Sequence, residues 1–155
     1  MKKIQLSIIA CFFVMNLTAQ DKNEINNFLD QWHRAAAEAD ANIYFGSMAD
    51  SSIYIGTDAT ERWTKQAFWE FSKPYFDKGK AWNFKPYDRQ LHVDQSGNVI
   101  WFSELLDTWM GVCRGSGIVE KINGQWKIRQ YHLSVTIPND NMPEFLELMK
   151  LDSDN

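Results

Sequence analysis

The stretch RGSGIVEKINGQWKIRQYHLS, residues 114–134, has the pattern of a β-hairpin. Its centre, Asn123-Gly124, favours a tight type I′ turn, and alternating strand patterns lie on both sides. Because successive side chains of a strand point to opposite faces, the spacing predicts one shared face for Trp126, Ile128, Gln130, His132 and Ser134. This face begins apolar and becomes polar. Such a change is typical of a strand that runs from a core into a pocket.

The segments around this hairpin predict an α+β domain. Alternation and turn signals predict four consecutive antiparallel strands, over residues 82–93, 98–110, 112–122 and 125–137. Upstream, helical spacing and turn signals predict a helix over 21–41, a short helix over 42–48, a strand over 51–56 and a third helix capped by Thr64. A short tail helix is expected at about 143–151. Helices that precede a meander are typical of a sheet covered by helices on one face.

Three motifs accompany these elements. They are Ile53-Tyr54-Ile55-Gly56-Thr57 followed by Arg62-Trp63-Thr64-Lys65, then Arg114-Gly115-Ser116-Gly117, and finally the second strand of the hairpin. With the long first helix, they make residues 22–137 resemble the SnoaL-like branch of the nuclear-transport-factor-2-like superfamily, which is named after a polyketide cyclase. The resemblance implies a cone-shaped fold. A curved antiparallel sheet, covered on one face by about three N-terminal helices, would wrap around a pocket.

The same resemblance implies acid/base chemistry in some relatives. Ketosteroid isomerase, a member of the superfamily, uses an aspartate base with a tyrosine and a protonated aspartate as hydrogen-bond donors. These catalytic positions have no match in the present chain, because His33 and Ala36 lie in the first helix where a phenolic donor would be useful. Whether the protein is an enzyme is therefore left open by the sequence.

Residues 1–20 have the features of a signal peptide. Lys2 and Lys3 precede an apolar run, and Leu17-Thr18-Ala19 is suited to cleavage near Ala19-Gln20. The run is shorter than the roughly 20 residues that span a bilayer, so no transmembrane segment is predicted. We expect an exported protein, periplasmic or secreted, whose remaining residues 21–155 form a single domain. In a less favoured alternative, Cys11 is lipidated and part of the apolar run stays on the mature chain.

Composition argues against several classes of function. The net charge of −4 becomes −6 when Lys2 and Lys3 leave with the signal peptide, and no basic run suggests a nucleic-acid partner. Cys113 would be the only cysteine after cleavage, so no internal disulfide is expected. The three scattered histidines have no metal-ligand spacing, and no motif predicts a cofactor.

His132 is the strongest candidate for a catalytic residue, because an imidazole exchanges protons near neutral pH. It lies at the polar end of the face that begins with Trp126, so it is expected to point into the cone. The simpler interpretation is that Gln130 and His132 hydrogen-bond to neighbouring strands. His33 is expected near the polar side of the first helix and is given no role.

Glu104 is the candidate partner of His132. It would share its strand face with apolar residues, namely Ile100, Phe102 and Leu106. Such surroundings raise the pKa of a carboxyl group, which can then act as a base near neutral pH. Two alternatives remain: Glu104 forms an ion pair with Arg114 on the next strand, or Asp107 faces the pocket instead.

Further residues are expected to line the pocket. We expect five residues to line the ligand pocket: Tyr54, Trp63, Phe102, Arg114 and Gln130. Trp69, Trp101 and Trp109 would also suit a flat ligand, although aromatic residues at such spacing are more often part of a core.

Two hypotheses follow for function. In the first, the exported protein binds a mostly apolar small molecule, with acid/base chemistry of isomerase, cyclase or hydrolase type at His132 and Glu104. In the second, it is a non-catalytic dimeric interaction module of the cell envelope. A homodimer through the outer face of the sheet is expected, because Trp101 and Trp109 would otherwise leave apolar area in water.

Overall fold

The computed structural model describes residues 19–153, with the side chains of residues 22–150. The predicted signal peptide, apart from its last two residues, and Cys11 lie outside the described residues. The elements follow in the order α1 (Ala19–Ala37), α2 (Ala41–Gly46), β1 (Met48–Ile55), β2 (Arg62–Thr64), α3 (Lys65–Asp77), β3 (Lys85–Val93), β4 (Val99–Thr108), β5 (Gly111–Ile122), β6 (Gln125–Val135), η1 (Asn139–Asn141) and α4 (Met142–Ser153).

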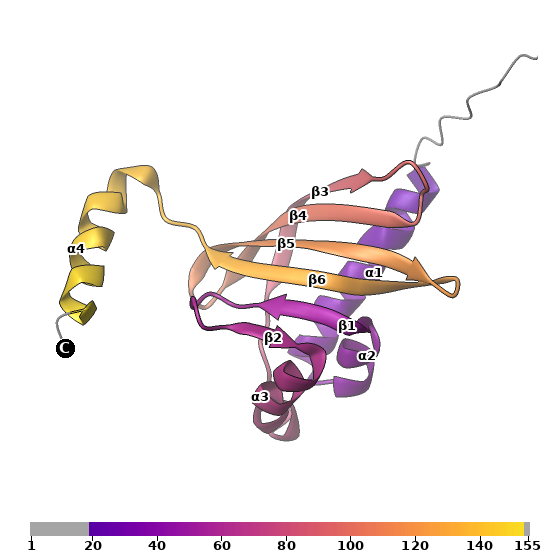
Figure 1. The fold of residues 1–155 in the computed structure, drawn as a ribbon, viewed down its shortest axis with the longest axis horizontal. Coiled ribbons are helices and arrows are strands. Elements are labelled where there is room, and N and C mark those ends of the chain that lie inside the picture. The colour runs from indigo at the N-terminus through magenta and orange to yellow at the C-terminus, as the bar shows by residue number, and fades with distance from the viewer. Residues whose placement is uncertain (1–18, 154–155) are drawn as a thin grey trace, which may run out of the picture.

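Six strands form one curved sheet in the order β2-β1-β6-β5-β4-β3 (Figure 1). Strands β3 to β6 pair antiparallel in chain order, as the meander prediction requires, and β1 joins the sheet by parallel pairing with β6. The long helix α1 crosses one face of the sheet (Figure 1). The predicted α+β fold, with N-terminal helices on one face of a curved sheet and a short C-terminal helix, is confirmed.

The apolar stripe of α1 supplies much of the core. Ile25, Leu29, Trp32 and Ala36, at spacings of four, three and four, are all nearly inaccessible to solvent. The ring of Trp32 stacks on Tyr44 of α2 at a centroid distance of 4.8 Å. Burial of each large apolar side chain contributes about 1.5–3 kcal/mol, so this stripe holds α1 against the sheet.

Local signals end and begin the elements as the sequence predicts. The Thr64 hydroxyl accepts a hydrogen bond from the Ala67 amide at 3.3 Å and so caps α3. Asn123 and Gly124 both have positive φ, 51° and 80°, as a type I′ turn requires. The short strand β2, which pairs with the end of β1, was not predicted. Three residues are too few to show a strand period.

A β-bulge interrupts β6 at Arg129. Ile118 of β5 lies opposite Gln130, whereas the next residue, Val119, lies opposite Ile128, so Arg129 is an extra residue on β6. Its guanidinium group donates hydrogen bonds to Glu120 and to the hydroxyl of Ser51. The bulge shifts the alternation by one position. Beyond it, Tyr131 and Leu133 face the core, and His132 between them faces outward.

Helix α4 stands apart from the rest of the domain (Figure 1). It packs mainly on the short η1 turn, and it exposes apolar residues: Leu146, Leu148 and Met149. In the part of the chain that the structure describes, no helix is both long enough and apolar enough to cross a membrane.

Candidate functional site

A cavity of about 550 Å³ opens between α3, the β1–β2 loop, the segment before β3 and the turn between β4 and β5. This volume lies within the usual range for small-molecule sites. Its wall is mainly aromatic and includes Tyr54, Trp63, Phe68, Phe71, Trp82 and Trp109. We call this feature the aromatic cavity.

Several of these rings contact one another. The rings of Tyr54 and Phe68 stack at a centroid distance of 3.9 Å, and Trp63 stacks on Phe71 at 4.8 Å. Trp109 forms part of the rim and is 83% exposed. The aromatic cavity therefore combines a packed wall of rings with an open, apolar edge.

The polar side chains at the wall of the aromatic cavity include Tyr54, Glu61 and Lys80. Tyr54 is 5% exposed, and its hydroxyl has no hydrogen-bond partner among the described residues. Burial, together with the negative charge of Glu61, raises the pKa of Tyr54, so the phenol stays neutral at physiological pH. Glu61 Oε2 accepts a hydrogen bond from the Asp58 amide at 3.2 Å.

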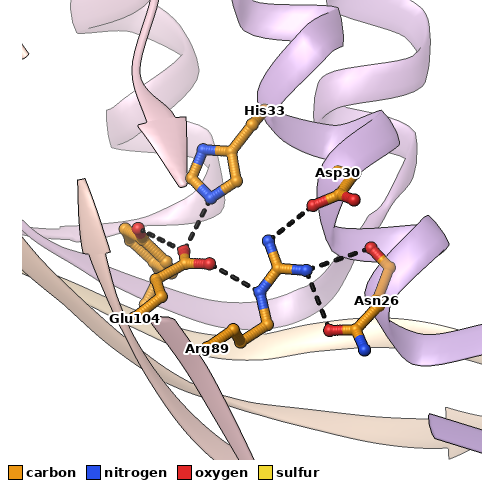
Figure 2. Close-up of polar contacts among 6 residues, drawn as sticks. Asn26, Asp30, His33, Arg89 and Glu104 are labelled. Atoms are coloured by element: carbon orange, nitrogen blue, oxygen red, sulfur yellow. Dashed lines mark hydrogen bonds and ion pairs between the residues drawn. The ribbon is translucent and has the colours of Figure 1, made fainter. Parts of the chain in front are cut away.

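A second group of polar side chains lies between α1 and the sheet (Figure 2), and none of its members lines the aromatic cavity. This buried polar cluster comprises Asn26, Asp30, His33, Arg89, Glu104 and Tyr131. At its centre, Glu104 is fully buried. Its Oε1 accepts hydrogen bonds from His33 Nε2 at 2.6 Å and from the Tyr131 hydroxyl at 3.0 Å, and its Oε2 accepts one from Arg89 Nε at 2.7 Å.

Arg89 links this carboxylate to α1. Its Nη1 donates to the main-chain and side-chain oxygens of Asn26, both at 3.1 Å, and its Nη2 donates to Asp30 at 2.8 Å (Figure 2). Asn26, Asp30 and His33 follow one another at spacings of four and three, so they share one face of α1. The buried polar cluster therefore fastens α1 to β3, β4 and β6.

Gly115 of β5 makes room for this arrangement. A Cβ atom at this position would clash with the Tyr131 hydroxyl and press against the side chain of Glu104. The RGSG motif of the sequence thus has a packing role beside the buried polar cluster.

The family model of the SnoaL-like domain matches residues 25–138. The chain belongs to the SnoaL-like family. No curated protein matches the sequence closely enough to count as a relative.

Solved structures share the fold of this SnoaL-like domain. An NTF2-like protein from Pseudomonas putida KT2440 is 16% identical, with a TM-score of 0.64, and the match covers 81% of this chain and 94% of that one. The association domain of C. elegans CaMKII is 16% identical, with a TM-score of 0.63, over 75% and 96% of the two chains. An NTF2-like protein from Cytophaga hutchinsonii is 15% identical, with a TM-score of 0.63, over 74% and 98%.

The prediction that His132 points into the cone and bonds to Glu104 is wrong. His132 is exposed on the outer face of the sheet, where its strand neighbours are Ser116 and Ile55. The physical reason is the bulge at Arg129, which reverses the facing of the residues that follow it. The sequence does contain a signal of this shift. The apolar positions of β6 change phase between Ile128 and Tyr131.

Glu104 points inward and Asp107 outward, as their odd separation predicts. However, the expectation of a raised pKa for Glu104 is wrong. Burial acts to raise it, but the hydrogen bonds of His33 and Arg89 and the positive charge of Arg89 outweigh burial and hold the pKa below its ordinary value. The suggested ion pair with Arg114 is also wrong, because Arg114 is exposed on the outer face and Arg89 takes that place.

Of the predicted pocket residues, some line the aromatic cavity in the structure and others lie elsewhere. Tyr54 and Trp63 line the aromatic cavity, and their contact with a ligand stays a prediction. Phe102 is buried in the core instead, and neither Arg114 nor Gln130 borders the aromatic cavity. Neither side chain is on the inner face of the sheet. Arg114 points outward in the regular alternation of β5, and Gln130 points outward because the bulge shifts the alternation of β6.

Sequence reasoning missed His33 and Arg89. His33 is 5% exposed, and although it borders a shallow surface hollow, its Nε2 is engaged by Glu104. A polar stripe at positions 26, 30 and 33, adjoining the apolar stripe of α1, was the available signal that this part of α1 contacts polar groups. Across residues 19–153, no cluster of side chains suited to a metal ion is found.

Proposed function

We propose that this SnoaL-like domain binds a flat, mostly apolar small molecule in the aromatic cavity. The observation that carries the proposal is the aromatic cavity itself, about 550 Å³ in volume and walled by aromatic rings. Aromatic walls with a few polar groups are typical of sites that bind small organic molecules. The Tyr54 side chain is 5% exposed and its hydroxyl has no partner among the described residues, so this hydroxyl is available to a ligand in the aromatic cavity.

The proposal does not include acid/base chemistry by His132 and Glu104. These two residues lie on opposite sides of the sheet, and neither lines the aromatic cavity. The Glu104 carboxylate already accepts hydrogen bonds from three protein side chains, so it is not free to accept a proton from a ligand. A binding role is therefore better supported than catalysis by this pair.

A neutral fluorescent probe, N-phenyl-1-naphthylamine, tests the binding function. We expect saturable binding with one site per chain, and a loss of affinity of about tenfold for Trp109→Ala, because this ring forms the apolar rim of the aromatic cavity. Trp101→Ala is the matched control, since Trp101 is an exposed tryptophan on the outer face of the same strand region. Absence of saturable binding would refute the proposal.

We further propose that the protein acts after export, with residues 1–20 removed. The basic start, apolar run and cleavage motif support this proposal. Mass spectrometry of the protein recovered from the periplasm or medium of an expressing bacterium should give a chain that begins near Asp21. Recovery of the full-length chain from the cytoplasm alone would contradict export.

An interaction module is the second candidate function. Trp101, Ile118 and Ile53 lie in one row across the outer face, and Trp101 is 49% exposed. Pairing of this face with a second copy would remove apolar area from water. Light scattering of the mature chain should then give twice the monomer mass, and Trp101→Glu should return it to the monomer mass. A monomer mass at micromolar concentration would exclude this candidate.

A further inference from the structure

We infer that the ligand of the aromatic cavity carries a positive charge, as a protonated amine or a quaternary ammonium group, that pairs with Glu61. This inference rests on the proposed binding function and narrows the class of ligand.

The carboxylate of Glu61 is held in place at the wall of the aromatic cavity. The Gly56 amide donates to the Glu61 main-chain oxygen at 2.8 Å, and the Glu61 amide donates to the Asp58 carbonyl at 3.0 Å. The side chain of Glu61 runs over Gly56, where a Cβ atom would clash with Oε2. The loop between β1 and β2 thus fixes the position of one negative charge.

Within the described residues, no ion pair neutralises this negative charge. Glu61 makes no ion pair with any described residue, and the Asp58 amide is the donor that its carboxylate receives from the protein. An ionised carboxylate offers about four acceptor sites, so most of its capacity is unused. A half-buried carboxylate among apolar groups favours a cation as its partner.

The aromatic wall favours the same sign of charge. The faces of Trp, Tyr and Phe rings carry negative electrostatic potential and attract a cation placed within about 6 Å. Trp63 stands beside Phe68, with ring centroids 5.6 Å apart, and Phe68 stacks on Tyr54. Glu61 increases the negative potential at this wall, consistent with its part in raising the pKa of Tyr54.

Lys80 is the competing charge, because it also borders the aromatic cavity. It is exposed, and no ion pair joins it to Glu61. A lysine side chain on a flexible stem turns readily into solvent, whereas the Glu61 carboxylate is fixed by its loop. The fixed charge is therefore expected to set the preference of the site.

Three naphthalene compounds of nearly equal shape test the inference: 2-naphthylmethylamine, 2-naphthylmethanol and 2-naphthoate. Their affinities are measured by titration calorimetry at pH 7 and low salt. We expect the amine, which is cationic at this pH, to bind at least about tenfold tighter than the alcohol. Glu61→Gln should reduce that ratio to about twofold, and continued saturable binding of N-phenyl-1-naphthylamine by this variant shows that the aromatic cavity is still folded.

Two further variants sharpen the test. Gly56→Ala keeps the charge but displaces the carboxylate, so it should also lower the ratio of amine to alcohol affinity. Glu70→Gln is the matched control, since Glu70 is an exposed carboxylate on α3 that bonds to Gln66.

The outcomes separate the inference from the proposed function. Equal binding of amine and alcohol, or tightest binding of the naphthoate, overturns the inference and leaves the binding function standing. An amine preference that survives Glu61→Gln also overturns it. If none of the three compounds binds, the proposed function fails and the inference fails with it.

Discussion

Glu104 and Glu61 are two glutamates set among aromatic side chains, in the buried polar cluster and at the aromatic cavity respectively. Glu104 receives three hydrogen bonds from His33, Arg89 and Tyr131, whereas Glu61 receives one from a main-chain amide. The difference shows how to distinguish a structural carboxylate from an available one. Burial alone does not decide it. The number of acceptor sites that the protein itself fills does.

The largest expected effect is on stability, in the variant Glu104→Ala. It would leave Arg89, whose side chain is 8% exposed, buried without its main partner. Removal of one member of a buried ion pair costs about 3–5 kcal/mol, so the free energy of unfolding in urea should fall by that amount. A fall of less than about 1 kcal/mol would show that the buried polar cluster does not hold α1 to the sheet.

Acid should weaken the same cluster. The pKa of folded Glu104 lies below its ordinary value of 4.5, so its contribution to stability is present above about pH 4.5 and is lost as the pH falls through the folded pKa. Glu104→Gln removes this titration. Between pH 5 and pH 2, about the range in which carboxylates titrate, the free energy of unfolding should fall less steeply in the variant than in the parent protein. If the free energy of unfolding fell equally steeply with pH in the two proteins, Glu104 would not be the group whose titration weakens the cluster.

A smaller effect is expected at the other glutamate. Glu61→Gln removes a charge that has no ion-pair partner among the described residues, and it leaves the loop hydrogen bonds of the main chain intact. The free energy of unfolding should therefore change by less than about 1 kcal/mol. Urea denaturation beside Glu104→Ala gives the direct comparison. Equal losses in the two variants would remove the distinction between a structural and an available carboxylate.

The smallest effect is expected for His132→Gln. This exposed side chain is the polar group that the sequence placed in the pocket. The free energy of unfolding should stay within about 0.5 kcal/mol, and the affinity for N-phenyl-1-naphthylamine should not change. A tenfold loss of affinity would restore His132 to the binding site.

The sequence predicted the fold well because the fold depends on patterns that span many residues. The stripe from Ile25 to Ala36 and the type I′ turn at Asn123-Gly124 each identify an element without knowledge of its neighbours. The four predicted strands also match β3 to β6 to within three residues at each end.

The site was predicted less well because it depends on single residues that break those patterns. Arg129 shifts β6 by one position, and the polar residues of α1 meet Arg89 only after β3 folds beside them. Tyr54 and Trp63, which were expected at the pocket, do line the aromatic cavity, and both belong to the motif that carries the family resemblance. Glu61 was not among the predicted site residues, because neither its closeness to Gly56 nor the absence of an ion pair with the described residues can be seen in the sequence.

The bulge at Arg129 also matters for any comparison with relatives of low identity, such as those at 15–16%. In an alignment without a gap, a relative whose last strand lacks the bulge would have its inward residues matched to Gln130 and His132. A one-residue gap at Arg129 matches them instead to Tyr131 and Leu133, the side chains that face the core. Residue roles transferred along β6 are therefore meaningful only after that gap has been placed.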